Sequence, residues 1–179
     1  MKNITRKLKI LKKRKFKKKL NSFFDWIKGA ELIELKSCDT REDPVRPELD
    51  VVFRNSYGRK IFGVKYQKEI CAIMCFGFTN EIPSTVKELD LMTRDAFLKS
   101  AQRDQNIGQI AIAYTIWSKK KGGGKLIVKE IFKMIKKSNH LNRLVTLSPL
   151  TDMARNFHLK NGATELKVNE ETQNFEYKI

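Results

Sequence analysis

Three consecutive glycines, Gly122 to Gly124, constrain the fold of this chain more than any other sequence feature. They follow residues 110–117, a run rich in β-branched and aromatic side chains that predicts a strand. They lead into residues 124–138, where apolar side chains recur with helical spacing. A glycine turn between a strand and a helix exposes the first N–H groups of the helix, which favour phosphate. We therefore expect a phosphorylated ligand at this turn.

Lysines flank the glycine turn on both sides. Lys119, Lys120 and Lys121 precede it, and Lys125 follows. We expect Lys119 and Lys125 to reach phosphate oxygens as flexible point charges, the alternative being a solvated rim. The Rossmann dinucleotide-binding loop does not fit, because no Gly-x-Gly-x-x-Gly is present. The Walker loop does not fit either, because no Ser or Thr follows Lys125.

The formal net charge of +17 is concentrated at the N-terminus. Residues 1–20 contain eleven Lys and Arg and no acidic residue, which leaves +6 for the other 159 residues. Residues 5–28 contain no Gly or Pro and are expected to be helical. Three interpretations stay open: an arm that binds nucleic acid or a ribonucleoprotein, a membrane-surface helix, or a solvated tail. We divide the chain into a basic tail, 1–29, and a domain, 30–179.

Length and composition indicate one globular domain. The hydrophobic content is 41%, and no apolar stretch approaches the roughly 20 residues that a membrane span needs. The three cysteines, Cys38, Cys71 and Cys75, include no Cys-x-x-Cys pair, so we expect a cytoplasmic protein without disulfides or a metal site. Cys71 and Cys75 have the same parity in a strand-like run, so we expect them on one face of the sheet.

Hydrophobic periodicity predicts a mixed α/β fold. Residues 69–78 are almost wholly apolar, which predicts a central strand that is buried on both faces. Together the expected elements predict a mainly antiparallel central sheet with helices on both faces. The other expected strands are 30–36, 60–66, 109–117, 143–147, 164–168 and 175–178, and the expected helical segments are 48–55, one within 79–105, 124–138 and 151–160.

The glycine turn resembles the pyrophosphate loop of the Gcn5-related N-acetyltransferase (GNAT) superfamily. That loop reads Gln/Arg-x-x-Gly-x-Gly/Ala after the fourth strand of the family's fold. Here Gly122 and Gly124 match both glycines, and Lys119 stands at the Gln/Arg position. The resemblance covers about residues 30–179, and some bacteriophage enzymes that modify DNA share this fold.

A second motif supports the resemblance. The family pattern Asn-x-x-Ala-x-x-x-Tyr-x-Lys-x-Gly lies on the helix after the fifth strand. In this chain Ala154, Lys160 and Gly162 match the pattern. Thr151 replaces the asparagine and His158 replaces the tyrosine, which puts the catalytic acid of the family in doubt.

The resemblance implies an acyl-CoA co-substrate, with acetyl-CoA favoured, and transfer of the acyl group to an amine. His158, at the position of the family's acid, and Tyr114 and Ser148, on the strands that would flank the cleft, are the catalytic candidates. The sequence does not identify the acceptor amine, and the phosphate affinity of the basic tail is consistent with a macromolecular or nucleic-acid acceptor. The alternative function is a non-catalytic basic nucleic-acid-binding protein on this fold. The expected acyl-CoA contacts are Ile116, Lys119, Gly122, Gly123, Gly124, Lys125 and Thr151.

Overall fold

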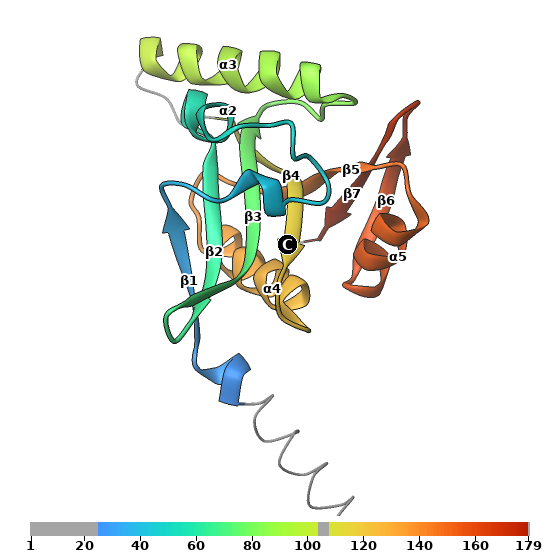
Figure 1. Cartoon of the computed structure of the whole chain (residues 1–179). Coiled ribbons are helices and arrows are strands. Elements are labelled where there is room, and N and C mark those ends of the chain that lie inside the picture. Colours follow the sequence, from blue (N-terminus) through green and yellow to red (C-terminus); the bar gives the residue numbers. More distant parts are fainter. Residues whose placement is uncertain (1–24, 104–107, 179) are drawn as a thin grey trace, which may run out of the picture.

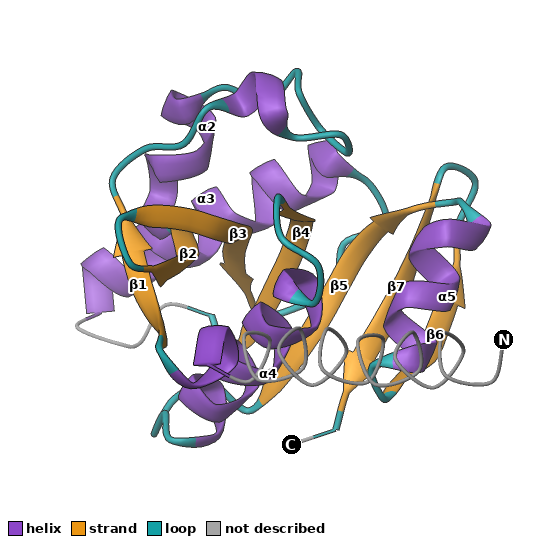
Figure 2. Cartoon of the chain, turned by 60° about the horizontal axis from the view of Figure 1, so that its bottom comes forward, coloured by secondary structure: helices purple, strands orange, loops and turns teal. Residues whose placement is uncertain are grey.

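The computed structural model describes residues 25–103 and 108–178. Seven strands form one sheet in the order β1-β2-β3-β4-β5-β7-β6 (Figure 2). Among the described strands, β4 and β5 are the parallel pair and all other neighbours are antiparallel. The strands are β1 (Ala30–Leu35), β2 (Lys60–Tyr66), β3 (Glu69–Thr79), β4 (Ile110–Ser118), β5 (Arg143–Pro149), β6 (Ala163–Val168) and β7 (Thr172–Tyr177).

The main helices also agree with the expected segments. Helix α3 (Val86–Arg103) lies across one end of the sheet next to α2 (Val51–Asn55), whereas α4 (Gly123–Lys136) and α5 (Asp152–Lys160) follow β4 and β5 (Figure 1). Two short 3₁₀ turns, Thr40–Glu42 and Ser56–Gly58, lie in the β1–β2 connection. The predicted mixed, mainly antiparallel α/β architecture is confirmed. No helix among the described residues is long and apolar enough to cross a membrane.

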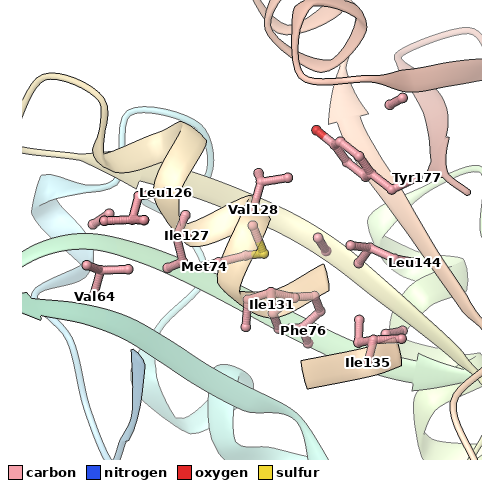
Figure 3. Close-up of a cluster of buried hydrophobic side chains, with 14 of the residues drawn as sticks. Val64, Met74, Phe76, Leu126, Ile127, Val128, Ile131, Ile135, Leu144 and Tyr177 are labelled. Carbon is pink, nitrogen blue, oxygen red and sulfur yellow. The ribbon is translucent and has the colours of Figure 1, made fainter. Parts of the chain in front are cut away.

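The first hydrophobic cluster lies between the sheet and α4. Ile127 and Ile131 of α4 are fully buried against Met74 and Phe76 of β3 (Figure 3). These side chains repeat at helical spacing on α4 and at alternate positions on β3, which is why periodicity predicted both elements. This packing fixes the N-terminus of α4 against the ends of the central strands.

The second cluster lies on the other face of the sheet. Leu89 of α3 is fully buried there, and Phe53 of α2 is packed against the same cluster. Cys75 of β3 and Ile112 of β4 face it from the sheet. Strand β3 is therefore buried on both faces, as its apolar sequence predicted.

The expectation that Cys71 and Cys75 share a face is wrong. Val64 pairs with Ala72 and Lys65 with Ile70, so Cys71 is an extra residue in β3, a β-bulge. The bulge shifts the alternation, and Cys71 is buried in the first cluster while Cys75 is buried in the second.

Residues 25–28 are helical and pack against the domain. The Trp26 ring is 2% exposed in the first cluster and meets Tyr66 edge to face, with ring centroids 5.6 Å apart. Lys120 lies over both rings. The proposed division at residue 29 therefore crosses a core contact, and residues 1–24, the bulk of the expected helical tail, lie outside the described residues.

Candidate functional site

Strands β4 and β5 pair over only part of their length. Their ladder runs from Ile110 and Arg143 to Ala113 and Thr146, yet both strands continue beyond it. Strand β4 carries a β-bulge at the point of separation, because Ala113 pairs with Phe76 of β3 and the next paired residue is Thr115. A bulge bends its strand and increases the twist, so the end of β4 diverges from β5.

A cavity of about 330 Å³ occupies the space between the diverging strands. Residues 113–119 of β4 and the following turn form one wall, and Ser148 of β5 contributes to the opposite wall. Helix α5 adds Phe157 and His158, and Gly124 marks the end that meets the glycine turn. We call this cavity the cleft.

A buried arginine spans the two strands where they separate. Arg46, in the β1–α2 connection, donates from Nε to the Tyr114 carbonyl oxygen (2.9 Å) and from Nη2 to the Leu147 carbonyl oxygen (3.2 Å). These are the first carbonyls beyond the paired residues of β4 and β5. The guanidinium therefore replaces interstrand hydrogen bonds, and burial lowers its pKa. Arg46 acts as a wedge that holds the cleft open.

A buried ion pair holds the segment that carries this wedge. Asp43 accepts from Arg54 Nη2 at 2.8 Å and from the Thr115 hydroxyl of β4 at 2.8 Å, and both charged side chains are sealed from solvent. Asp43 also accepts from the backbone N–H of Arg46 (3.2 Å), and Arg54 donates to the Arg46 carbonyl oxygen (2.8 Å). The network fixes the Arg46 backbone relative to β4.

The three glycines of the turn have different surroundings. Gly122 has a φ of 85°, a left-handed conformation that favours glycine. A Cβ on Gly123 would lie 3.1 Å from the Cys71 carbonyl oxygen, and one on Gly124 would lie 3.1 Å from the Phe157 ring. Because α4 begins at Gly123, helix geometry leaves the N–H groups of Gly124 and Lys125 without intrahelical acceptors.

The flanking lysines lie in three different places. Lys119 lines the cleft and forms an ion pair with Glu42, which also lines it. Lys120 covers the Trp26 ring, with Nζ 4.9 Å from the ring centroid. Lys125 lines a second cavity, outside the cleft wall. Of the two lysines expected to contact phosphate, the structure brings the Lys119 side chain to the cleft.

Two other expected cofactor contacts lie on the cleft wall. Ile116 belongs to the diverging end of β4. Thr151 is the N-cap of α5, where its hydroxyl accepts from the Ala154 N–H at 3.3 Å. Their contacts with a cofactor stay predictions.

Of the catalytic candidates, Ser148 and His158 lie side by side at the cleft. Ser148 Oγ is 2.8 Å from His158 Nε2, and His158 Nδ1 is 2.9 Å from the Tyr177 hydroxyl of β7. The imidazole is 4% exposed and stacks on Phe175, with centroids 5.0 Å apart. Burial lowers the pKa of His158 to about 4, so the ring is neutral at physiological pH. A charged imidazolium acid therefore does not fit this position.

Tyr114 differs from the other two candidates. Its backbone belongs to the cleft region, but its ring is fully buried in the second cluster, edge to face with Phe53. Burial raises the pKa of its phenol, and the hydroxyl has no hydrogen-bond partner among the described residues. A hydroxyl enclosed in the core cannot exchange protons with a substrate in the cleft, so we withdraw it as a catalytic group.

Sequence reasoning missed Arg46, Asp43 and Tyr177. The first two lie in an irregular segment without hydrophobic periodicity, where no local pattern signals a long-range contact. Tyr177 was placed in a terminal strand, but its contact with His158 depends on how β7 inserts between β5 and β6. No cluster of three metal-ligating side chains occurs within residues 25–103 and 108–178.

No protein-family model matches the sequence, and no curated protein matches it. Solved structures do match. Malonyl-CoA decarboxylase from Cupriavidus metallidurans has a TM-score of 0.61 at 15% identity, over 92% of this chain. This chain spans 65% of that protein.

Two further structures match over nearly their whole length. A Bacillus subtilis acetyltransferase in complex with CoA has a TM-score of 0.55 at 12% identity, covering 84% of this chain and 97% of that one. The GNAT-like decarboxylase GphF in complex with isobutyryl-CoA has a TM-score of 0.59 at 9% identity, covering 83% and 98%. These likenesses show that the chain has the GNAT fold.

The buried neutral imidazole predicts an acid-sensitive stability. An unfolded chain binds a proton at His158 below the ordinary pKa of 6.5, whereas the folded protein does so only near 4. His158 thus contributes stability above pH 6.5 that is lost as the pH falls towards 4, in total about 3 kcal/mol. Urea unfolding of wild type and His158→Gln between pH 7 and 4 measures this contribution.

The exposed His140 provides the matched control for that measurement. His140→Gln should retain the acid-dependent loss, and His158→Gln should lose most of it. Equal pH dependence in the two variants would show that His158 titrates normally in the folded protein.

Proposed function

We propose that this protein is an acyl-CoA-dependent N-acyltransferase that uses acetyl-CoA as donor. The observation that carries the proposal is the separation of β4 from β5 after Ala113 and Thr146, which opens a cleft between the N-terminus of α4 and the Ser148–His158 pair. A long, linear thioester with a phosphorylated end fits such a cleft, because phosphate and reactive group have separate places at its two ends.

The pantetheine arm would lie along the free edge of β4. Beyond Ala113, β4 remains paired with β3 on one side, through Thr115, Ile116 and Trp117, but not with β5 on the other. In an antiparallel pair, alternate residues direct their N–H and C=O groups away from the partner. The amides of pantetheine would hydrogen-bond to these groups and take the place of a neighbouring strand.

The pyrophosphate would lie at the start of α4. The N–H groups of Gly124 and Lys125 have no intrahelical acceptor, and the positive end of the helix dipole points to the same place. Lys119 adds an ammonium group at the cleft wall, where its pairing with Glu42 limits the net charge. The roles that we assign to Gly122 and Gly123 are indirect, since they let the turn fold closely against β3.

The chemistry at the other end of the cleft centres on Ser148 and His158. Attack of an amine on the thioester carbonyl forms a C–N bond and breaks the C–S bond, and the leaving thiolate then needs a proton. The Ser148 hydroxyl is the donor we place at the thiolate, with the neutral His158 imidazole behind it at 2.8 Å. His158 thereby acts through serine and not as a charged acid.

A nucleic-acid acceptor, or binding of nucleic acid without catalysis, would depend on residues 1–20. These residues lie outside the described part of the chain. Pro44 and Val45 of the β1–α2 connection also line the cleft and would lie next to the acceptor.

Decarboxylation of a carboxyacyl-CoA is a second candidate. This reaction needs a proton donor for the carbanion but no base for an amine. Glu42 is the carboxylate on the described cleft wall, and its ion pair with Lys119 makes it a poor base. Two structures of the same fold belong to proteins named as decarboxylases. Both candidates use the same cleft and the same Ser148–His158 pair.

Product analysis separates the two candidates. We expect the full chain to release free CoA thiol from acetyl-CoA in the presence of a polyamine or peptide amine, as read by a thiol reagent and mass spectrometry. Conversion of malonyl-CoA to acetyl-CoA and CO₂, without amine-dependent thiol release, would instead establish the decarboxylase.

Filling the cleft should prevent CoA binding. Ala154 of α5 lines the cleft, and a phenylalanine there would occupy space that we assign to the ligand. We expect Ala154→Phe to raise the Kd for CoA at least about tenfold, equivalent to 1.4 kcal/mol, in isothermal titration calorimetry. Lys160→Phe, at an exposed site on the same helix, is the control and should bind as wild type does. Equal affinity of the two variants would place the ligand elsewhere.

A further inference from the structure

A chain of three side chains connects the cleft with a second cavity. Ser148 Oγ lies 2.8 Å from His158 Nε2, and His158 Nδ1 lies 2.9 Å from Tyr177 Oη. Ser148 and His158 line the cleft, whereas Tyr177 lines the second cavity, of about 260 Å³. We propose that Ser148, His158 and Tyr177 form a proton relay that links the acyl-CoA site to solvent in the second cavity.

The partners of His158 leave its tautomer free to change. A histidine with a structural role usually donates one N–H to a carbonyl or carboxylate, which fixes the tautomer. Both ring nitrogens of His158 instead face hydroxyl groups, and a hydroxyl either donates or accepts. Ser148 Oγ is also 3.1 Å from Thr146 Oγ1, another hydroxyl that either donates or accepts. Two complete arrangements therefore exist. With the proton on Nε2, Ser148 accepts from the ring and donates to Thr146, and with the proton on Nδ1, Ser148 donates to Nε2 and accepts from Thr146.

The surroundings hold the ring in place without charging it. Phe175 stacks on the imidazole with an interplanar angle of 24°, and Phe157 and Tyr177 meet its edge. No carboxylate is within ion-pairing distance of His158 among the described residues. A ring that is fixed, neutral and hydrogen-bonded on both sides passes protons by changing tautomer.

The second cavity lies at the Tyr177 end of the relay and would connect it to water. Val128 and Phe132 of α4 form the apolar part of its wall. The polar part is formed, besides Tyr177, by Lys125, Lys129, Asn161 and Lys178. These polar side chains suit a cavity that admits water, whereas the cleft would be filled by acyl-CoA. Protons therefore have a route to solvent that the bound substrate does not block.

The relay completes the proton balance of amide formation, and this step rests on the proposed function. In the outward direction, the attacking amine gives a proton to Ser148 Oγ, Ser148 gives its own to Nε2, the Nδ1 proton moves to Tyr177 Oη, and the tyrosine proton moves to water. The imidazole now carries its proton on Nε2.

The inward direction restores the first state. Ser148 protonates the thiolate that leaves with the C–S electron pair, Nε2–H reprotonates Ser148, Tyr177 reprotonates Nδ1, and water reprotonates Tyr177. One proton leaves and one returns in each turnover, and the imidazole regains its original tautomer. A base for the amine and an acid for the thiolate are thus supplied by the same three groups.

The Tyr177→Phe variant tests the relay because it removes one hydroxyl and keeps the ring. We expect kcat to fall about tenfold or more, as for loss of a proton-transfer group, with the Kd for acetyl-CoA and Tm near wild type. Tyr66→Phe, remote from the relay, is the matched control. An unchanged kcat in Tyr177→Phe, while wild type is active, would overturn the relay; an inactive wild type would overturn the proposed function instead.

A spectroscopic test needs no turnover. The chain has two histidines, so a His140→Gln background leaves His158 as the one imidazole for ¹⁵N NMR. We expect ¹⁵N shifts that are averaged between the two tautomers, and a shift to a single tautomer when Tyr177→Phe is added. A single fixed tautomer in the protein that retains Tyr177, unchanged by the substitution, would contradict the relay.

Discussion

The end of the hydrogen-bonded ladder between β4 and β5 is the constraint on which the rest of this structure depends. Two parallel strands in one sheet normally stay paired, because separated strands leave backbone groups without partners. Here a bulge at Tyr114 bends β4 away from β5. The Arg46 guanidinium donates hydrogen bonds to the first carbonyl beyond the ladder in each strand. The remaining groups face an open cleft instead of a dry core.

Keeping a cleft open requires support from outside the sheet. Asp43 and Arg54 supply it through a buried ion pair that is also bonded to Thr115 and to the Arg46 backbone. A buried pair of this kind contributes little net stability, but loss of one partner leaves an uncompensated charge. Its value here is geometric, since it fixes the irregular segment against β4.

The chemistry at the cleft follows from burial. An exposed histidine is partly charged near neutral pH, and His158 is not, because the surrounding aromatic rings exclude water. Neutrality removes the role of a charged acid, and a pKa of about 4 makes the ring a weak base, so the geometry favours transfer through the ring. His158 stands where the GNAT pattern has a tyrosine. In the proposed relay a tyrosine hydroxyl still takes part in proton transfer, because Tyr177 is hydrogen-bonded to His158.

The sequence predicted the parts of the fold that local pattern determines. The strand, glycine turn and helix around Gly122 depend on neighbouring residues, and so does the Thr151 cap of α5. The bulge at Cys71 and the contact between Arg46 and Leu147, 101 residues apart, depend on pairing between distant segments. Tyr114 illustrates the same limit. The sequence placed it correctly on the strand that lines the cleft, but its side chain is buried on the other face, in the second cluster.

The central claim is that acyl-CoA occupies the space where a neighbouring strand would pair with β4. Hydrogen–deuterium exchange with mass spectrometry tests it directly, because free strand amides exchange rapidly and hydrogen-bonded ones do not. Acetyl-CoA should slow exchange in residues 114–118 and 122–125 and leave α3 unchanged. Binding of acetyl-CoA with no added protection in residues 114–118 would contradict the claim.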